Sequence, residues 1–508
     1  MGVRRWYPLT NRETLDSFIW CFVTLGVCLN MASHGLTVGF AAILLPQLRR
    51  PDSIIPIDAS SGSWIASILG FALVVGNFIC PTVMANYGRR AANIVSIAPM
   101  LAGWFCILFA TNLHTLLVAR LFQGISMGMS ASLGPVIIGE YTSPKNRGPF
   151  LASISVTIAT GVLIVHAMGS FTSWQTTALV CAIIGFIDLL IVIYSPETPS
   201  WLADQGRYDE SRKIFRWLRG DGEEDELQRM IDSSIIIRES KAEVSSSETF
   251  FQKLRRNVVY FRITIRKREF HKPIFIMMHI YTLGMWSGAN LLAAYTVDIF
   301  ENVVGKGSNI PLLVITMGVH RIISNTCAVF VIRKVKRRTM LVATVAINVC
   351  AYLSIAAYSY GKQHGMLPFD HPMIGIILIN IHIFSIATGT VPLPFIIAGE
   401  LFPLEFRSLA GGISVLFLSA NLFLSIKTAP LLFLKIGIHG AYLIYACIVT
   451  YCLVVAWFFL PETKDRTLQD IEDEFRGRPL SPEEVKSVQS LHSLMMYKTD
   501  RRCSQPVI

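Results

Sequence analysis

Long apolar stretches constrain the fold of this chain more than any other feature of its sequence. There are about twelve of them, each near the roughly 20 apolar residues that a helix needs to cross a bilayer. They lack the alternation of barrel strands, and an isolated strand in lipid would leave its backbone unpaired. The predicted spans are 18–45, 63–85, 92–111, 114–138, 148–172, 174–194, 272–300, 309–333, 339–359, 371–398, 408–434 and 437–460. The predicted fold class is therefore an all-α polytopic membrane protein with twelve transmembrane helices.

The placement of charge predicts how these spans are oriented. The formal net charge of +11 is by itself compatible with nucleic-acid binding. The basic residues, however, gather in alternate loops: Arg4 and Arg5, Arg89 and Arg90, Lys145 and Arg147, residues 195–271, and Arg333 to Arg338. Loops rich in Lys and Arg stay on the cytoplasmic side of a membrane. We therefore expect both termini to be cytoplasmic, with the lipid bilayer as a partner and no nucleic acid.

Two segments outside the spans are polar. Residues 195–271 are charged and show helical patterns at 208–218 and 223–237, whereas the polar end of the chain has a composition typical of disorder. The predicted domains are a cytoplasmic N-terminus (1–17), a first six-helix half (18–194), a cytoplasmic linker (195–271), a second six-helix half (272–460) and a cytoplasmic, mostly disordered tail (461–508).

The sequence offers no pattern typical of a reaction centre. It has no nucleophile–base constellation, no metal-ligand spacing among its ten cysteines and no Walker-type glycine-rich loop. We therefore expect neither an enzyme nor an ATP-driven pump, and no cofactor or metal.

Three short signals occur twice, about 250 to 265 residues apart, as in transporters built from structural repeats. The pairs are Gly88-Arg89-Arg90 with Lys336-Arg337-Arg338, Glu140 and Arg147 with Glu400 and Arg407, and Pro196-Glu197-Thr198 with Pro461-Glu462-Thr463. Each signal ends or joins predicted spans. The repeat predicts two similar six-helix halves that rock against each other.

The repeated charges have two interpretations. In the first, fixed positive charge serves only to keep a loop on the cytoplasmic side. Alternatively, guanidinium groups pair with carboxylates in partly dehydrated sites, which makes an ion-pair latch. Because the signals occur twice at matching offsets, we favour the latch. The predicted cytoplasmic gate consists of Arg89, Arg90, Glu140, Arg147, Arg337, Arg338, Glu400 and Arg407.

Taken in order, the motifs resemble the sugar porter family of the major facilitator superfamily, most closely its insect trehalose and hexose facilitators. The motifs are Trp64, Gly88-Arg89-Arg90, Arg120 with Gly124 and Gly128, Gly134-Pro135, Glu140 to Pro144 with Arg147-Gly148, Pro196 to Leu202, Ser287 to Asn290, Pro392 to Phe395, Glu400 to Pro403 with Arg407, and Pro461 to Lys464. The resemblance covers nearly the full chain. It implies the twelve-helix fold with a helical linker, facilitative sugar uptake and a plasma-membrane location.

The same resemblance implies a sugar site, from which this sequence departs. The family has two glutamines in the seventh span where this chain has Gly284 and Met285, and only Asn290 of that set remains. The fifth-span glutamine aligns with Ser155, and the tenth-span tryptophan aligns with Phe395. We retain Ser155, Asn290 and Phe395 as predicted substrate-binding residues.

A charged residue stands in the eighth predicted span. Arg321 lies about where the family has another sugar-contacting asparagine. A charge at that depth normally faces the bundle interior and marks a functional site. It is either a substrate-binding residue, which would favour an anionic solute, or a structural residue that pairs with a carboxylate such as Asp298.

Other polar residues in the spans are candidates for the path or for helix–helix pairing. They are His34, Asn77, His166, His279, Asn421 and Lys427. Pro392 and Pro394 are expected to bend the tenth span, either as a tolerated kink or as the hinge of a gate. The first span has no carboxylate in its middle, which favours a uniporter.

Three functions remain open from the sequence. The first is alternating-access transport of a sugar or polyol, and the second is transport of a non-sugar, anionic organic solute by the same fold. The third is a membrane sensor that no longer transports. In the first two the partner is a small-molecule solute.

Overall fold

The structure, a computed structural model, describes residues 12–141, 144–219, 223–244, 264–265, 267–305, 307–367, 369–402, 407–464, 466, 471 and 474–477. Within these ranges it gives the backbone alone for residues 12–24, 144–152, 219, 233, 236–244, 269 and 407–409. Throughout the described part of the chain the regular elements are helices. Ten described segments are long and apolar enough to cross a membrane.

The first half contains one helix for each of its six predicted spans. These are α1 (Arg12–Leu48), α2 (Ala59–Tyr87), α3 (Arg89–Leu108), α4 (Leu113–Tyr141), α5 (Pro144–Phe171) and α6 (Trp174–Tyr194). Small residues let membrane helices approach closely, and α2 and α4 depend on them. A Cβ atom on Gly76 would lie 2.0 Å from the Ile125 carbonyl oxygen, and one on Gly128 would lie 2.1 Å from the Leu73 carbonyl oxygen. A side chain at either position would push the two helices apart.

The second half contains three departures from unbroken helices. Its elements are α11 (Arg268–Trp286), α12 (Ala289–Val303), α13 (Ile310–Lys334), α14 (Arg337–Gln363), α15 (Pro372–Ser385), the π-helical turn η2 (Ile386–Thr390), α16 (Pro392–Leu401) and α17 (Arg407–Phe459). Helix α17 covers two predicted spans, with the non-helical Gly437 between them. The predicted span 272–300 is instead divided into α11 and α12. One of the ten apolar segments lies in α17 and covers two predicted spans, and α11 with α12 forms a further span that is not among the ten. The total is therefore the twelve predicted spans.

The break between α11 and α12 is stabilised by donors from neighbouring helices. Gly288 has a φ of 100°, in the left-handed region that favours glycine. The freed carbonyl groups of Trp286 and Ser287 accept hydrogen bonds from the Tyr352 hydroxyl (2.8 Å) and from His382 Nε2 (2.9 Å). Irregular backbone is tolerated at membrane depth only where its polar groups find such partners.

The tenth predicted span is irregular directly before its prolines. The π-helical turn η2 ends at Thr390, and Pro392 lies in the first turn of α16. Proline has no backbone N–H, so the first turn of a helix is where it fits without loss of a hydrogen bond. The irregularity thus lies where Pro392 and Pro394 were expected to bend the span, while their role as a hinge remains a prediction.

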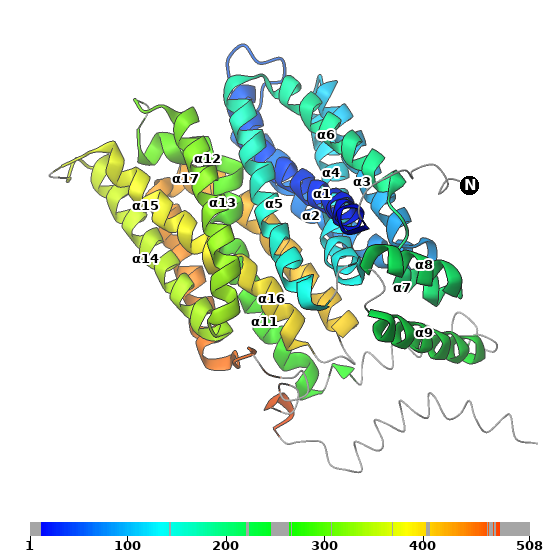
Figure 1. Cartoon of the computed structure of the whole chain (residues 1–508). Helices are drawn as coiled ribbons and strands as arrows, with labels where there is room; N and C mark the ends of the chain where they lie inside the picture. Colours follow the sequence, from blue (N-terminus) through cyan, green and yellow to red (C-terminus); the bar gives the residue numbers. More distant parts are fainter. Residues whose placement is uncertain are drawn as a thin grey trace, which may run out of the picture.

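Three short helices follow the first half. They are α7 (Pro199–Asp204), α8 (Tyr208–Arg219) and α9 (Glu224–Val244), of which α8 and α9 coincide with the predicted helical patterns. They pack around an apolar cluster of Ala203, Phe215, Leu227 and Ile231. In Figure 1 they lie together at one end of the helix bundle. We call this end the linker face and the other end the opposite face.

The remaining predicted soluble segments lie largely outside the described residues. These are the N-terminus before Arg12, residues 245–263 of the linker and the tail after Gly477.

The two halves lie side by side, with the blue-to-cyan helices in one and the green-to-orange helices in the other (Figure 1). Helix α1 packs against α12, α2 against α17 and α5 against α13. These three pairs form the boundary along which the halves meet, and any path between the halves runs beside them.

Candidate functional site

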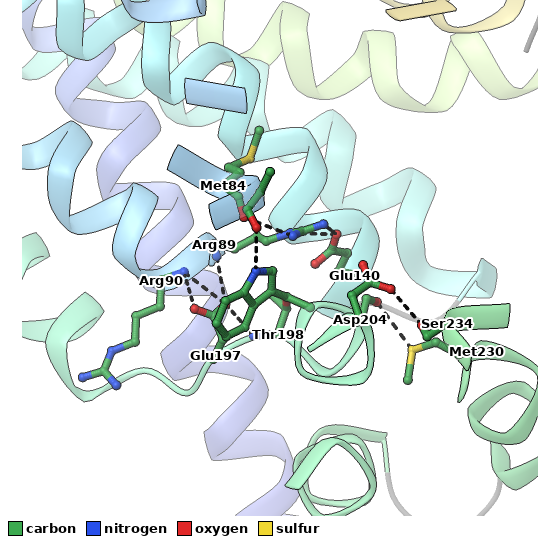
Figure 2. A network of polar contacts seen from close by, with 12 residues as sticks. Met84, Arg89, Arg90, Glu140, Glu197, Thr198, Asp204, Met230 and Ser234 are labelled. Atoms are coloured by element: carbon green, nitrogen blue, oxygen red, sulfur yellow. Dashed lines mark hydrogen bonds and ion pairs between the residues drawn. The ribbon is translucent and has the colours of Figure 1, made fainter. Parts of the chain in front are cut away.

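The first copy of the repeated signals forms an ion pair at the linker face. Arg89, the first residue of α3, places its Nε atom 3.0 Å and its Nη2 atom 2.7 Å from Oε1 of Glu140, near the end of α4. Figure 2 shows the two side chains directed toward each other. Both side chains are largely buried, at 17% and 16% exposure, so the pair is less screened by solvent than an ordinary surface pair.

Glu197 forms the centre of this copy. Its carboxylate accepts the backbone N–H groups of Arg89 (2.9 Å), Arg90 (3.1 Å) and Thr198 (2.8 Å) (Figure 2). The first N–H groups of a helix have no partner within that helix and carry partial positive charge. Glu197 therefore caps α3 from the segment between α6 and α7. Burial raises the pKa of Glu197, and the N–H bonds offset part of that rise.

Gly88 is required by this arrangement. Its φ is 97°, and a Cβ atom there would lie 2.2 Å from Oε2 of Glu197. The indole N–H of Trp201 donates to the carbonyl oxygen of Ala85 (3.4 Å), which attaches α7 to the end of α2.

The second copy repeats the first with small differences. Glu462 accepts the backbone N–H groups of Arg337 (2.8 Å) and Arg338 (3.1 Å) at the start of α14. Arg337 Nη2 lies 3.3 Å from Oε1 of Glu400, whose Oε2 accepts the Thr463 hydroxyl (2.6 Å). The second latch therefore repeats the arginine–carboxylate pair and the N–H contacts of the first, with a longer ion pair and an additional hydroxyl donor.

Lys336 replaces the glycine of the first copy without strain. Its φ is −61° and its ψ is 138°, an extended conformation open to any residue. The glycine missing from the second signal is thus not needed there.

Arg90 and Arg338 were predicted to pair with carboxylates, but their side chains contact backbone carbonyl oxygens instead. The Arg90 guanidinium donates to the carbonyl oxygen of Ile193, at the end of α6. That of Arg338 donates to the carbonyl oxygen of Trp457 and lies 5.5 Å from its ring. Cations near a helix C-terminus satisfy its free carbonyl groups. In the latch, these two residues contribute only their backbone N–H groups.

The side chains of Arg147 and Arg407 lie outside the described residues, although both belong to helices, in the first turns of α5 and α17. Their predicted pairing with Glu140 and Glu400 remains a prediction. In the described part of the chain, the cations on these two carboxylates are Arg89 and Arg337.

An ion pair that was not predicted joins the halves at the opposite face. Arg49 Nη1 lies 2.9 Å from Oδ1 and 3.0 Å from Oδ2 of Asp298. Arg49 follows α1 in the first half, and Asp298 belongs to α12 in the second. The suggested pairing of Arg321 with Asp298 is not observed among the described residues, where the cation on Asp298 is Arg49.

Lys427 forms a second link between the halves near the same face. Its Nζ atom donates to the Ser63 hydroxyl at 2.7 Å and lies 3.9 Å from the centre of the Trp64 ring. A cation over an indole face is attracted by the ring quadrupole. Trp64 also packs against Phe423, so α2 and α17 are joined by polar and aromatic contacts together.

The four predicted substrate-binding residues lie on different helices. Ser155 belongs to α5, and its carbonyl oxygen accepts from Asn325 of α13 at 3.3 Å. Asn290, in the first turn of α12, donates to the Met285 sulfur at 3.4 Å. The Phe395 ring on α16 packs against Tyr281 at 6.0 Å. The fourth, Arg321, belongs to α13. No described contact joins all four, so their common role remains a prediction.

Most of the other polar candidates have partners on adjacent helices. Asn77 accepts from Ser132 (2.6 Å), and Asn421 accepts from the indole N–H of Trp286 (2.9 Å). These contacts favour helix pairing over a solute path for both residues. Buried His34 Nδ1 has no hydrogen-bond partner among the described residues.

His279 lines an apolar pocket between α11 and α17. The pocket is lined by Met278, His279, Thr282, Phe417, Cys447, Ile448, Tyr451 and Cys452. The Nε2 atom of His279 also lies 3.5 Å from the Tyr451 hydroxyl oxygen, within hydrogen-bond distance. None of the four predicted substrate-binding residues lines this pocket.

Sequence reasoning missed Glu197 and Glu462 as functional residues, although it used the Pro-Glu-Thr repeat that contains them. The signal was their duplication together with that of the paired arginines: Glu462 lies 265 residues after Glu197, and Arg337 lies 248 residues after Arg89. Arg49 and Asp298 carried no such signal, because their contact joins residues that are far apart in the sequence.

The chain is similar in sequence to insect sugar transporters. It is 26% identical over 491 residues to the facilitated trehalose transporter Tret1 of Aedes aegypti, covering 95% of this chain and 58% of that protein. It is 27% identical over 416 residues to Tret1 of Apis mellifera ligustica, covering 82% of this chain and 79% of that protein. The chain thus spans little more than half of the first relative and about four fifths of the second.

Solved transporters have the same fold. The inward-open xylose transporter XylE of E. coli superposes with a TM-score of 0.69 at 16% identity, covering 89% of this chain and 99% of XylE. A POT family transporter in complex with a thioalcohol-conjugated peptide gives 0.59 at 13% identity, covering 89% and 97%. Residues 22–475 match the family described as "Sugar (and other) transporter". The chain is therefore a multi-pass membrane protein with the fold of these transporters, and it belongs to the sugar (and other) transporter family.

Proposed function

We propose that this protein moves a sugar across the plasma membrane by alternating access, without an energy source other than the solute gradient. The observation that carries the proposal is the duplicated latch, present once in each half with the same arginine–carboxylate pair and N–H contacts. Rigid halves that rock about a shared boundary are how transporters with repeated architecture work. The trehalose transporters among its relatives support a sugar as the solute.

In this mechanism the latches keep each half rigid at the linker face, which we take to be cytoplasmic. Arg89 and Glu140 join α3 to α4, while Glu197 joins the start of α3 to the end of α6. Among the described basic clusters, Arg89 and Arg90 and the cluster from Arg333 to Arg338 belong to the latches, and by the positive-inside rule they support a cytoplasmic position of this face. Both termini would then be cytoplasmic.

The opposite face supplies the complementary closure. The Arg49–Asp298 ion pair and the Lys427–Ser63 hydrogen bond both join the halves there. We infer that both contacts form when the path is closed to the outside and separate when it opens. Ser155, Asn290 and Phe395 are proposed to line the path, and Pro392 and Pro394 are proposed to form the hinge of the tenth span.

Uptake by purified protein in proteoliposomes tests this function. We expect saturable entry of radiolabelled trehalose or glucose that ceases when the gradient is collapsed, and at least a tenfold loss of rate in the double variant Glu140→Gln, Glu400→Gln. The exposed Arg207–Glu210 pair on α8 provides a matched control, because Glu210→Gln removes an ion pair outside the bundle. Absence of saturable uptake of any sugar by the wild type, or equal rates in the latch and control variants, would refute the proposal.

A further inference from the structure

Arg321 occupies the inward face of α13 near the middle of that helix. Residues three and four apart share one side of a helix. The positions one turn before Arg321 (Met317, Gly318) and one turn after it (Ser324, Asn325) are all buried. Exposed side chains on α13, such as Ile323, point elsewhere. Arg321 is therefore directed into the protein rather than toward lipid.

That face of α13 packs on the first half. A Cβ atom on Gly318 would lie 2.6 Å from the Leu163 side chain of α5, and Asn325 donates to the Ser155 carbonyl oxygen of the same helix. Arg321 lies between these two contacts along α13. Arg321 is thus placed at the boundary along which the two halves move.

His166 of α5 forms a second link across the boundary of the halves. Its Nε2 atom lies 3.2 Å from the Gly39 carbonyl oxygen of α1 and 3.3 Å from the Ala293 carbonyl oxygen of α12. The imidazole therefore joins α1 and α5 of the first half to α12 of the second.

Arg321 has no acceptor in the described part of the chain. Its Nε atom is buried without a hydrogen-bond partner, and the carboxylate of Asp298 is engaged by Arg49. Arg120, the other arginine buried within the spans, behaves differently. It donates to the carbonyl oxygens of Ile65 (3.2 Å) and Thr37 (2.8 Å) and to Gln123 Oε1 (2.9 Å). Arg120 is therefore a structural residue, and Arg321 lacks the contacts that would make it one.

We propose that the Arg321 guanidinium binds the carboxylate of the transported solute, which makes the preferred substrate a sugar acid rather than a neutral sugar. An intramembrane cation is retained where it has a functional partner. A guanidinium offers two parallel N–H donors that match one carboxylate, and the unpaired Nε atom leaves that fork free. A single cation suits a monoanion better than the dianion of a phosphate. This inference rests on the proposed function and names the class of its substrate.

Uptake of three matched probes by wild-type proteoliposomes tests the substrate class. We expect saturable uptake of D-glucuronate at least tenfold more efficient than that of D-glucose, and little uptake of glucose 6-phosphate. If the protein takes up glucose but neither takes up glucuronate nor is inhibited by it, the inference is overturned and the proposed function still stands. Preferential uptake of glucose 6-phosphate overturns the assignment of a carboxylate. Absence of uptake for every sugar refutes the proposed function and this inference together.

Variants of Arg321 test the residue itself. In Arg321→Gln we expect the ratio of glucuronate uptake to glucose uptake to fall at least tenfold relative to wild type, and in Arg321→Lys we expect a partial recovery of that ratio. Thr316→Ala, on the exposed side of the same helix, controls for expression and insertion. Equal glucuronate uptake in Arg321→Gln and Thr316→Ala refutes the role. If Arg321→Gln does not fold, glucuronate must still raise the melting temperature of the wild type more than glucose does, and equal shifts overturn the inference.

Discussion

Removal of the Glu197 carboxylate measures how strongly the latch holds the first half together. Glu197→Ala deletes the acceptor of three backbone N–H groups, those of Arg89, Arg90 and Thr198. A hydrogen bond to a charged group contributes about 1.5 to 3 kcal/mol, and a donor left unpaired adds to the loss. Burial of the carboxylate, which raises the pKa of Glu197, offsets part of this gain. We therefore expect a loss of about 3 to 5 kcal/mol.

The melting temperature of detergent-purified protein, followed by tryptophan fluorescence, measures this loss. At about 2 °C per kcal/mol for a cooperative unit the size of one half, Glu197→Ala should melt about 6 to 10 °C below wild type. Glu462→Ala removes the equivalent acceptor in the second half and should give a similar decrease. Glu224→Ala breaks an exposed ion pair with Arg216 and should leave the melting temperature within about 1 °C. If the melting temperature of Glu197→Ala equals that of the Glu224→Ala control, the capping hydrogen bonds do not stabilise the first half.

Three further outcomes follow from the same contacts. Gly88→Ala should lower the melting temperature and the uptake rate, because a Cβ atom there meets Oε2 of Glu197 at 2.2 Å, whereas Lys336→Ala should be neutral in both assays. Arg49→Gln and Asp298→Asn can be compared in a double-mutant cycle, with labelling of a path cysteine by an external reagent as the measurement. The labelling rate should increase about two- to fivefold in each single variant, and the double variant should label no faster than either. Additive effects would mean that the pair is not coupled. Burial raises the folded-state pKa of Glu197 above 4.5, so the part of its contribution that depends on protonation is fully present below about pH 4.5 and is lost as pH rises through the raised pKa, whereas the three N–H hydrogen bonds persist. The melting temperature of wild type minus that of Glu197→Gln should therefore fall over that window without reaching zero; a difference that rises with pH would contradict the sign.

Most of the fold follows from local composition. Each predicted span coincides with helix in the structure within a few residues, because about 20 apolar residues in lipid leave the backbone no alternative to helix. The break at Gly288 did not follow, since the donors that make it tolerable, Tyr352 and His382, come from other helices. The same holds for the π-helical turn before Pro392: proline predicts a disturbance but not its form.

The contacts of the candidate site were likewise predicted only in part. Duplication of the signals pointed to the ion pairs of Arg89 and Arg337, because a repeated structure repeats its contacts. It did not predict that the second arginine of each signal would cap a helix end with its side chain. That outcome depends on where α6 and α17 end relative to Arg90 and Arg338.

The sequence by itself determined that this chain is a duplicated bundle of membrane helices with a latch in each half. Hydrophobic length and charge placement are local quantities that lipid and water act on directly. Only the tertiary structure decided which charges meet. Arg49 and Asp298 are 249 residues apart and pair because α1 packs against α12. The same packing leaves Arg321 at the boundary of the halves without a described acceptor, while Asp298 is engaged at the opposite face by Arg49.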